Sequence, residues 1–180
     1  MNIIIFDTET TGLLKPEINM LAAQPYITEI HCKKVNENLE VLDVFDSLVK
    51  PPISIPEELQ RKIGITDAMV ASAPTFSELY SRLATFFLDV PICIGHNVAF
   101  DIGMLHNELA RIEKVLHFPW PIRHVCTVEK SKYIEQRRIN LTTLHTYATG
   151  VPFDGAHRAS ADVSALLSCC IWLNQNDKLF

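Results

Sequence analysis

The chain opens with the stretch M-N-I-I-I-F-D-T-E-T-T-G, residues 1–12, around which the expected sheet is built. Residues 3–6 are apolar at every position, as is typical of a strand buried on both faces in the centre of a sheet. Asp7 and Glu9 follow this run, and side chains two apart on a strand point to the same face. Two carboxylates about 4 Å apart repel by roughly 4 kcal/mol at an effective dielectric constant of 20. A cation or a bound proton must therefore accompany them, which marks a candidate site.

Length and composition predict one domain, residues 1–180, with no membrane partner. The chain is 48% hydrophobic and 21% charged, which is ordinary for a globular protein. It has no apolar run near the roughly 20 residues of a membrane span, and no signal-peptide pattern, so we expect a cytoplasmic protein. The net charge of −5 argues against broad adsorption to duplex DNA, but it is compatible with a narrow site that grips one strand end.

The cysteine pattern argues against a disulfide framework or a structural zinc site. There are five cysteines, an odd number, and none form a C-x-x-C pair. We expect four of them to act as small apolar residues, including the adjacent pair at positions 169 and 170.

The order of apolar patterns predicts a mixed α/β fold with a single sheet. We expect strands at residues 3–6, 26–35, 41–49, 92–94 and 123–127. We expect helices at residues 57–63, 75–88, 97–115, 128–135, 141–149 and 159–174. The first three strands follow one another, with a hairpin tip at Glu37-Asn38, so we expect them to be antiparallel. Strands first and strand–helix alternation afterwards is typical of one mixed sheet flanked by helices.

Two later segments add the residues that the opening carboxylates need. Residues 94–101, I-G-H-N-V-A-F-D, lead from a short strand into a helix and place Asp101 in its first turn. Residues 157–162, H-R-A-S-A-D, place His157 in a loop and Asp162 early in the last helix. Carboxylates near helix N-termini are favoured by the helix dipole and can be aimed across a strand end.

These residues predict metal-assisted chemistry at phosphorus. Oxygen-only ligands favour a hard cation, Mg²⁺ or Mn²⁺, over zinc. Four carboxylates in one cleft can hold two such ions about 3.5–4 Å apart, the arrangement that stabilises in-line attack on a phosphate. The imidazole of His157 has an unperturbed pKa near neutrality and therefore suits deprotonation of the attacking water.

The motifs D-x-E-T-T-G, G-H-N-x-x-F-D and H-x-x-x-x-D, in this order, resemble those of the DEDDh (DnaQ-like) 3′→5′ exonucleases. That family includes the proofreading (epsilon) subunit of bacterial DNA polymerase III and RNase T. The resemblance implies a ribonuclease H-like fold, a mixed five-stranded sheet flanked by helices. It also implies that the general base is His157 and that the metal ligands are Asp7, Glu9, Asp101 and Asp162.

The same resemblance implies a groove for the terminal nucleotide. The residues that match groove positions of the family are Thr10, Thr11, Gly12, His96, Asn97 and Phe100. An aromatic side chain such as Phe100 can stack on a base, and a backbone can approach a ligand closely at Gly12. Many relatives carry a histidine before the Gly-Ile-Thr that follows the first helix, whereas this chain has Ile63 there. A substrate contact made at that position is either missing or supplied by Lys62.

The expected function is metal-dependent 3′→5′ hydrolysis of single-stranded nucleic acid, DNA slightly favoured over RNA, with release of nucleoside 5′-monophosphates. The alternative is a non-catalytic nucleic-acid-binding module of the same fold, which would lack one of the five chemical residues; none is missing. An endonuclease or integrase-like enzyme of this fold is disfavoured because it would place its acids differently. Dimers are common among RNase T-like relatives, but no stretch marks a partner face, so the oligomeric state stays open.

The densest basic stretch has two interpretations. It contains Lys130, Lys132, Arg137 and Arg138. The default interpretation is a solvated helix face. The other is a patch that guides the phosphates of an incoming strand toward the metal ligands.

Overall fold

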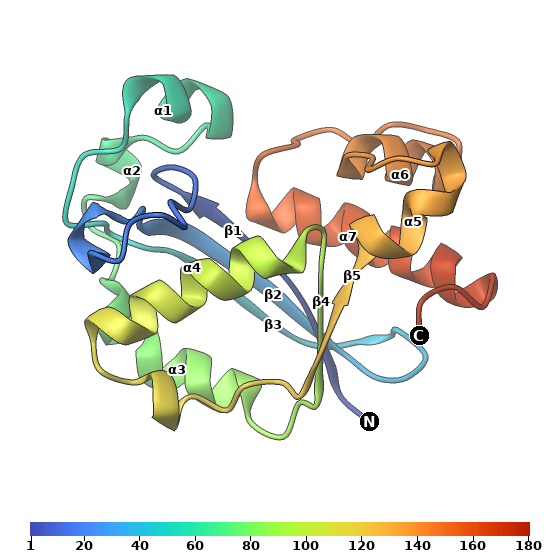
Figure 1. Cartoon of the computed structure of the whole chain (residues 1–180), viewed down its shortest axis with the longest axis horizontal. Coiled ribbons are helices and arrows are strands. Elements are labelled where there is room, and N and C mark those ends of the chain that lie inside the picture. The colour runs from blue at the N-terminus through green and yellow to red at the C-terminus, as the bar shows by residue number, and fades with distance from the viewer.

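The computed structural model describes residues 1–180 and contains five strands and seven α-helices (Figure 1). The strands are β1 (Ile3–Thr10), β2 (Ile27–Val35), β3 (Val41–Leu48), β4 (Ile92–Gly95) and β5 (Arg123–Cys126). The helices are α1 (Glu57–Ile63), α2 (Asp67–Val70), α3 (Phe76–Phe87), α4 (Val98–Arg111), α5 (Thr127–Glu135), α6 (Leu141–Thr149) and α7 (Ala159–Gln175). All expected strands and helices are present, together with the short helix α2, which Thr66 caps. None of the helices is both long and apolar enough to cross a membrane.

The strands form one sheet in the order β3-β2-β1-β4-β5. The first three strands are antiparallel, as expected, whereas β4 runs parallel to β1 and β5 runs parallel to β4. The predicted mixed five-stranded sheet is therefore confirmed. In this order β1 lies at the centre. Strand β4 pairs with β1 as far as Ile5, so β4 ends, and α4 begins, next to the part of β1 that carries Asp7.

Helices cover both faces of the sheet (Figure 1). Because successive strand residues point to opposite faces, Ile4 and Phe6 of β1 pack in the core with α3 and α4. Ile3 and Ile5 pack on the other face, against α7. All four side chains are at most 1% exposed, which fits a strand buried on both sides.

Strand β1 is longer than its apolar run. The run ends at Phe6, but pairing with β2 continues to Thr10, which lies opposite Ile27. Asp7 and Glu9 are therefore part of the regular ladder, and their side chains project on the α7 face of the sheet, together with those of Ile3 and Ile5.

Local signals set most helix boundaries. Gly64 has a φ of +69° and ends α1, while Thr75 starts α3 with a capping box completed by Glu78. The prediction for residues 97–115 was too long, because α4 ends at Arg111. The chain turns there, with a φ of +57° at Glu113, before a short 3-10 turn over Val115–His117.

Candidate active site

Three elements bring four carboxylates to one end of the sheet. Asp7 and Glu9 come from β1, Asp101 from the first turn of α4 and Asp162 from the first turn of α7. Carboxylate oxygens of Asp7, Glu9 and Asp162 all lie within 4.8 Å of one another. The structure therefore brings together acids that are as much as 155 residues apart in the sequence, counting from position 7 to position 162.

Asp101 is held beside this group by Thr8. The backbone N–H and the hydroxyl of Thr8 donate to Oδ1 of Asp101 at 3.0 and 2.8 Å. Asp101 is 2% exposed and is not among the three acids within 4.8 Å of one another. Its charge is nevertheless close enough to help raise the pKa of Asp7.

Simultaneous ionisation of the four acids is energetically unfavourable. Burial raises the pKa of Asp7 well above its ordinary value, with further increases from Asp101, Asp162 and Glu9. Burial, followed by the charge of Asp162, raises the pKa of Glu9 to about 8. Burial also raises the pKa of Asp101 to about 7 and that of Asp162 to about 6. The cluster is short of positive charge, which is the condition that a bound cation relieves.

The donor set fits a hard divalent cation. The three clustered acids supply only oxygen atoms, and neither a cysteine nor a histidine is among them. Oxygen ligands in this number favour cations such as Mg²⁺ or Mn²⁺. Asp7, Glu9 and Asp162 would hold such a cation, and the charge of Asp101 lies close to them.

Without divalent cations, the protein should lose stability as the pH rises from about 6.5 to about 8.5. An acid whose pKa is raised by folding stabilises the folded state fully when the pH is below the pKa of the unfolded state, near 4. This stabilisation is lost as the pH rises through the pKa of the folded state. For Glu9 and Asp101 those values are about 8 and about 7. Burial lowers the pKa of His96 to about 4, so His96 makes stability increase with pH. This increase is complete by about pH 6.5, the lower end of this range.

Calorimetry in EDTA should therefore show a Tm lower by roughly 5 °C at pH 8.5 than at pH 6.5. The same scans with millimolar Mg²⁺ or Mn²⁺ should give a higher Tm and little fall, because cation binding stabilises the folded state by linkage. A metal-free Tm that rises over this range would contradict the proposed electrostatics of the acid cluster.

His157 lies in the loop before α7 and next to the acids. Its backbone N–H donates to Oδ2 of Asp162 at 3.0 Å, and its side chain is exposed. Partial burial, together with the nearby charge of Lys62, lowers the pKa of His157. The imidazole is therefore neutral at pH 7 and able to accept a proton.

A cleft of about 260 Å³ joins His157 to the end of β1. Its lining residues are Thr8, Glu9, Thr10, Gly12, Leu13, Leu59, Lys62, Ile63, Phe100 and His157. The position of Lys62 in this cleft fits the interpretation that it supplies the contact made elsewhere by a histidine. A Cβ on Gly12 would lie 3.7 Å from that of Pro25, an ordinary contact, so packing alone does not require glycine there.

Thr10 and Thr11 make hydrogen bonds within the protein. The hydroxyl of Thr10 donates to the carbonyl of Gly12 at 2.7 Å, which shapes the turn at the end of β1. Thr11 exchanges hydrogen bonds with Tyr26 through its hydroxyl and backbone N–H, and it does not line the cleft. Of the two threonines, only Thr10 therefore faces the cleft.

His96 and Asn97 are also engaged within the protein. The ring of His96 contacts the Thr127 hydroxyl through Nδ1 at 3.0 Å and the Ile139 carbonyl through Nε2 at 3.2 Å. A neutral ring that donates from Nε2 and accepts at Nδ1 satisfies both contacts, so neither nitrogen is free for a ligand. Asn97 is exposed, has a φ of +72°, and accepts a hydrogen bond from Arg138 at 2.8 Å.

The basic stretch divides into paired and site-linked residues. Lys132 pairs with Glu129, and Arg137 pairs with Glu135. Arg138 alone connects to an expected groove residue, through its bond to Asn97 at the start of α4. Of the four basic residues, Arg138 is thus the one that the fold ties to the site.

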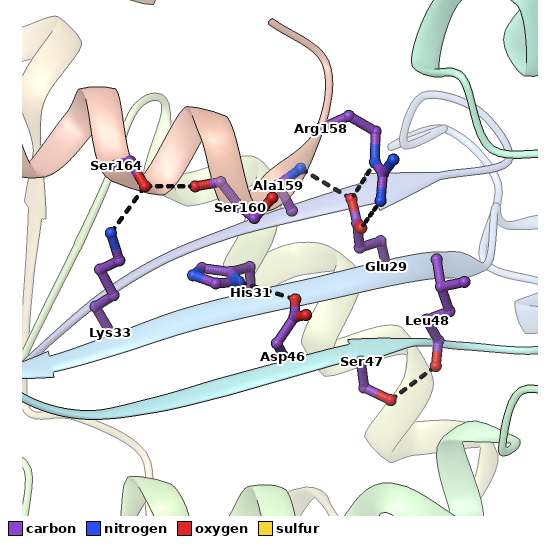
Figure 2. Close-up of polar contacts among 10 residues, drawn as sticks. All are labelled: Glu29, His31, Lys33, Asp46, Ser47, Leu48, Arg158, Ala159, Ser160 and Ser164. Carbon is purple, nitrogen blue, oxygen red and sulfur yellow. Dashed lines mark hydrogen bonds and ion pairs between the residues drawn. The ribbon is translucent and has the colours of Figure 1, made fainter. Parts of the chain in front are cut away.

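One acid near the site was not recognised from the sequence. Glu29 of β2 lies opposite Glu9, is 3% exposed and pairs with Arg158 (Figure 2). The available signal was a charged residue between Ile27 and Ile30 in an expected strand. A buried charge requires a partner, but the sequence does not show which one.

Comparisons with known proteins show the family to which the chain belongs. The profile of the exonuclease family named for RNase T matches residues 4–169. The chain is 28% identical over 166 residues to a PolC-type DNA polymerase III of Clostridium perfringens, covering 90% of this chain and 10% of that protein. The chain thus spans about a tenth of the length of the first curated relatives that it matches.

Two solved structures share the fold. One is a 3′-exonuclease that recognises the 3′ end of a histone mRNA stem-loop, with a TM-score of 0.78 and 16% identity; 98% of this chain and 64% of that chain are covered. The other is E. coli ExoI with zinc and single-stranded DNA, with a TM-score of 0.77 and 18% identity; 97% of this chain and 40% of that chain are covered. These likenesses confirm the expected ribonuclease H-like exonuclease fold.

Proposed function

Because the chain belongs to the RNase T family of exonucleases, we propose that it hydrolyses the 3′-terminal phosphodiester of single-stranded nucleic acid and releases nucleoside 5′-monophosphates. The observation that carries this proposal is the group of three carboxylates within 4.8 Å of one another, beside a cleft that His157 also lines. An acid cluster next to an exposed, neutral imidazole is suited to activating water for attack on a phosphate.

Each residue has a distinct role in this reaction. Asp7, Glu9, Asp101 and Asp162 would hold two divalent cations, Mg²⁺ or Mn²⁺. When bound, the cations supply the positive charge that stabilises the attacking and leaving oxygens of an in-line displacement. His157 accepts a proton from the attacking water as its oxygen bonds to phosphorus and the bond to the 3′ oxygen breaks.

The cleft receives the terminal nucleotide. Phe100 lines it and offers an aromatic face on which a base can stack. Lys62 lines it and supplies a positive charge close to Glu9 and His157, where a phosphate would lie. Thr10 and Gly12, at and just after the end of β1, also line the cleft, and a backbone can approach the sugar closely at a glycine.

DNA is slightly favoured over RNA as the substrate. The curated relative is named as a DNA polymerase, which supports DNA, whereas one structural neighbour is named for an mRNA stem-loop. A protein separates the two polymers by how its groove treats the 2′-hydroxyl. Matched DNA and RNA oligonucleotides, free and duplexed, therefore measure this preference directly.

The test of the proposed function is degradation of a labelled oligonucleotide with product sizes resolved. With Mg²⁺ or Mn²⁺, a 3′-labelled single strand should release labelled mononucleotide from the first turnover, and EDTA should stop the release. Internal cleavage products would indicate an endonuclease instead. Binding without turnover in both metals would indicate the non-catalytic module.

Lys62→Ala should raise the KM for a short single strand by about tenfold, because a charge-assisted bond to a phosphate is lost. The kcat should change by less than about threefold, since the acids and His157 remain in place. Steady-state kinetics at low salt measures both constants.

Arg61→Ala is the matched control for this change. Arg61 neighbours Lys62 on α1 but does not line the cleft, so its KM should match that of the wild type. Equal KM values for the two variants would remove Lys62 from the substrate site.

A further inference from the structure

Glu29 ties the start of α7 to the sheet. Its side chain is 4% exposed and accepts hydrogen bonds from Nη2 and Nε of Arg158 at 2.7 and 3.3 Å, and from the backbone N–H of Ala159 at 2.9 Å (Figure 2). Arg158 immediately precedes α7, and Ala159 is the first residue of that helix. Paired bonds between a guanidinium and a carboxylate fix geometry as well as adding energy. These groups form the Glu29–Arg158 clamp.

The clamp adjoins His157, which needs support. His157 has a φ of +70°, in the left-handed region that L residues other than glycine rarely adopt. Such a conformation persists only where surrounding contacts hold it. The residues before it, 154–156, are exposed, and the contacts that hold His157 lie on its C-terminal side. They are the bond from its own N–H to Oδ2 of Asp162 and the clamp at the next residue, Arg158.

The position of Asp162 depends much less on the clamp than that of His157. Helix α7 is anchored by Val163, Leu166 and Cys170, which are at most 1% exposed in the core against the sheet. Loss of the clamp should therefore release the loop that carries His157 while the helix that carries Asp162 stays in place.

The charge of Arg158 explains why an acid can occupy this position. Glu29 lies opposite Glu9 and helps to raise the pKa of both Glu9 and Asp162. A buried carboxylate without a counter-charge beside four other acids would be strongly destabilising. Arg158 is 39% exposed on its side chain, so it reaches the buried acid from the solvent edge of the site.

We propose that Glu29 and Arg158 are positioning residues that act through His157 and hold its imidazole at the proton-accepting position. The inference rests on the proposed function, because His157 is the base of that reaction. It differs from two simpler roles, a contact that only stabilises the fold and an Arg158 side chain that only binds substrate phosphate.

The experiment compares Glu29→Gln, Arg158→Met and the double variant, each with His157 present and in the His157→Ala background. The kcat and KM for a short single strand are measured at saturating Mn²⁺. Glu108→Gln is the matched control, since Glu108 is 6% exposed, pairs with Arg111 and accepts the Ile27 N–H. It lies on α4 about two turns beyond Asp101 and does not line the cleft.

With His157 present, each single variant should lower kcat by about 10- to 100-fold and change KM by less than about threefold. The double variant should be no worse than the poorer single variant, because both residues serve one contact. In the His157→Ala background the same changes should lower kcat by less than about threefold. Glu108→Gln should lower Tm but leave kcat unchanged.

Hydrogen exchange in EDTA provides a readout that needs neither activity nor metal. The backbone amides of His157 and Ala159 should exchange at least about tenfold faster in Arg158→Met than in the wild type. Amides within residues 163–173 of α7 should not change. If the wild type degrades no oligonucleotide, the proposed function fails, and the exchange data still decide whether the clamp holds the loop.

Three results would overturn the inference. An equal fall in kcat in both backgrounds would mean that the clamp does not act through His157. A higher KM with an unchanged kcat would make Arg158 a substrate contact. A lower Tm with unchanged kcat and unchanged exchange at His157, as in Glu108→Gln, would leave a structural contact only.

Discussion

Asp7→Asn should abolish nuclease activity and at the same time stabilise the metal-free protein. Asp7 contributes to the group of acids within 4.8 Å and points to the same face as Glu9. Its loss removes a ligand from the metal site, so we expect kcat to fall by at least about 10³-fold, the scale of losing a preorganised electrostatic group. Enzymes often gain stability when such a strained polar site is relieved.

The gain in stability has a specific electrostatic origin. Burial and four neighbouring acids raise the pKa of Asp7 well above its ordinary value, so ionisation of Asp7 opposes folding. An amide carries no charge and can donate to the carboxylates of Glu9 or Asp162. The Tm in EDTA at pH 8 should rise by about 2–8 °C, which corresponds to about 1–2 kcal/mol in a domain of this size.

Asp67→Asn is the control for Asp7→Asn. Asp67 accepts the backbone N–H of Ile55 at 2.8 Å at the start of α2 and lies outside the cleft. Its replacement should lower Tm slightly and leave kcat unchanged. If Asp7→Asn instead kept more than a tenth of the activity, or lowered the metal-free Tm, the acid cluster would not be the strained metal site described above.

His157→Ala should lower kcat by roughly 10²–10⁴-fold, the usual contribution of a general base. His157 is exposed and its backbone N–H donates to Asp162, while burial together with Lys62 lowers the pKa of its imidazole, so the ring is neutral at pH 7. The KM should change little, because the aromatic face of Phe100 and the charge of Lys62 remain in the cleft. Single-turnover kinetics at saturating Mn²⁺ separates this loss of chemistry from slow product release.

His117→Ala is the control for the loss of an exposed imidazole. His117 lies in the 3-10 turn after α4 and does not line the cleft, so its kcat should match that of the wild type. A fall of less than tenfold in His157→Ala would remove His157 from the role of base. The inference about the Glu29–Arg158 clamp would then fail with it.

The sequence was sufficient wherever a structural feature depends on neighbouring residues. The apolar run over residues 3–6 predicted the central strand, because burial on both faces leaves a continuous pattern. Helices α1 and α6 match their predicted bounds, since Gly64 and Gly150 end them with positive φ angles of +69° and +83°. Helix α4 was predicted too long, because the residue with positive φ after its end is Glu113, and no glycine marks the stop there.

The sequence also predicted which acids belong together, because each of the three motifs carries its acids at a spacing that a strand or a helix start can orient. It could not show that both ring nitrogens of His96 bond to Thr127 and Ile139, 31 and 43 residues further along the chain. A histidine at position 96 gives the same sequence pattern whether its ring binds a ligand or bonds to other parts of the protein.

By itself, then, the sequence determined the central strand, the acids and the chemistry that they favour, because these follow from residue type and from the period of a strand or helix. Only the tertiary structure decided how His157 is held. The contact between Glu29 and Arg158 joins residues 129 positions apart, and the φ of His157 depends on what surrounds it. Such contacts arise when the chain folds back on itself, and no local pattern encodes which distant residue will lie opposite a buried charge.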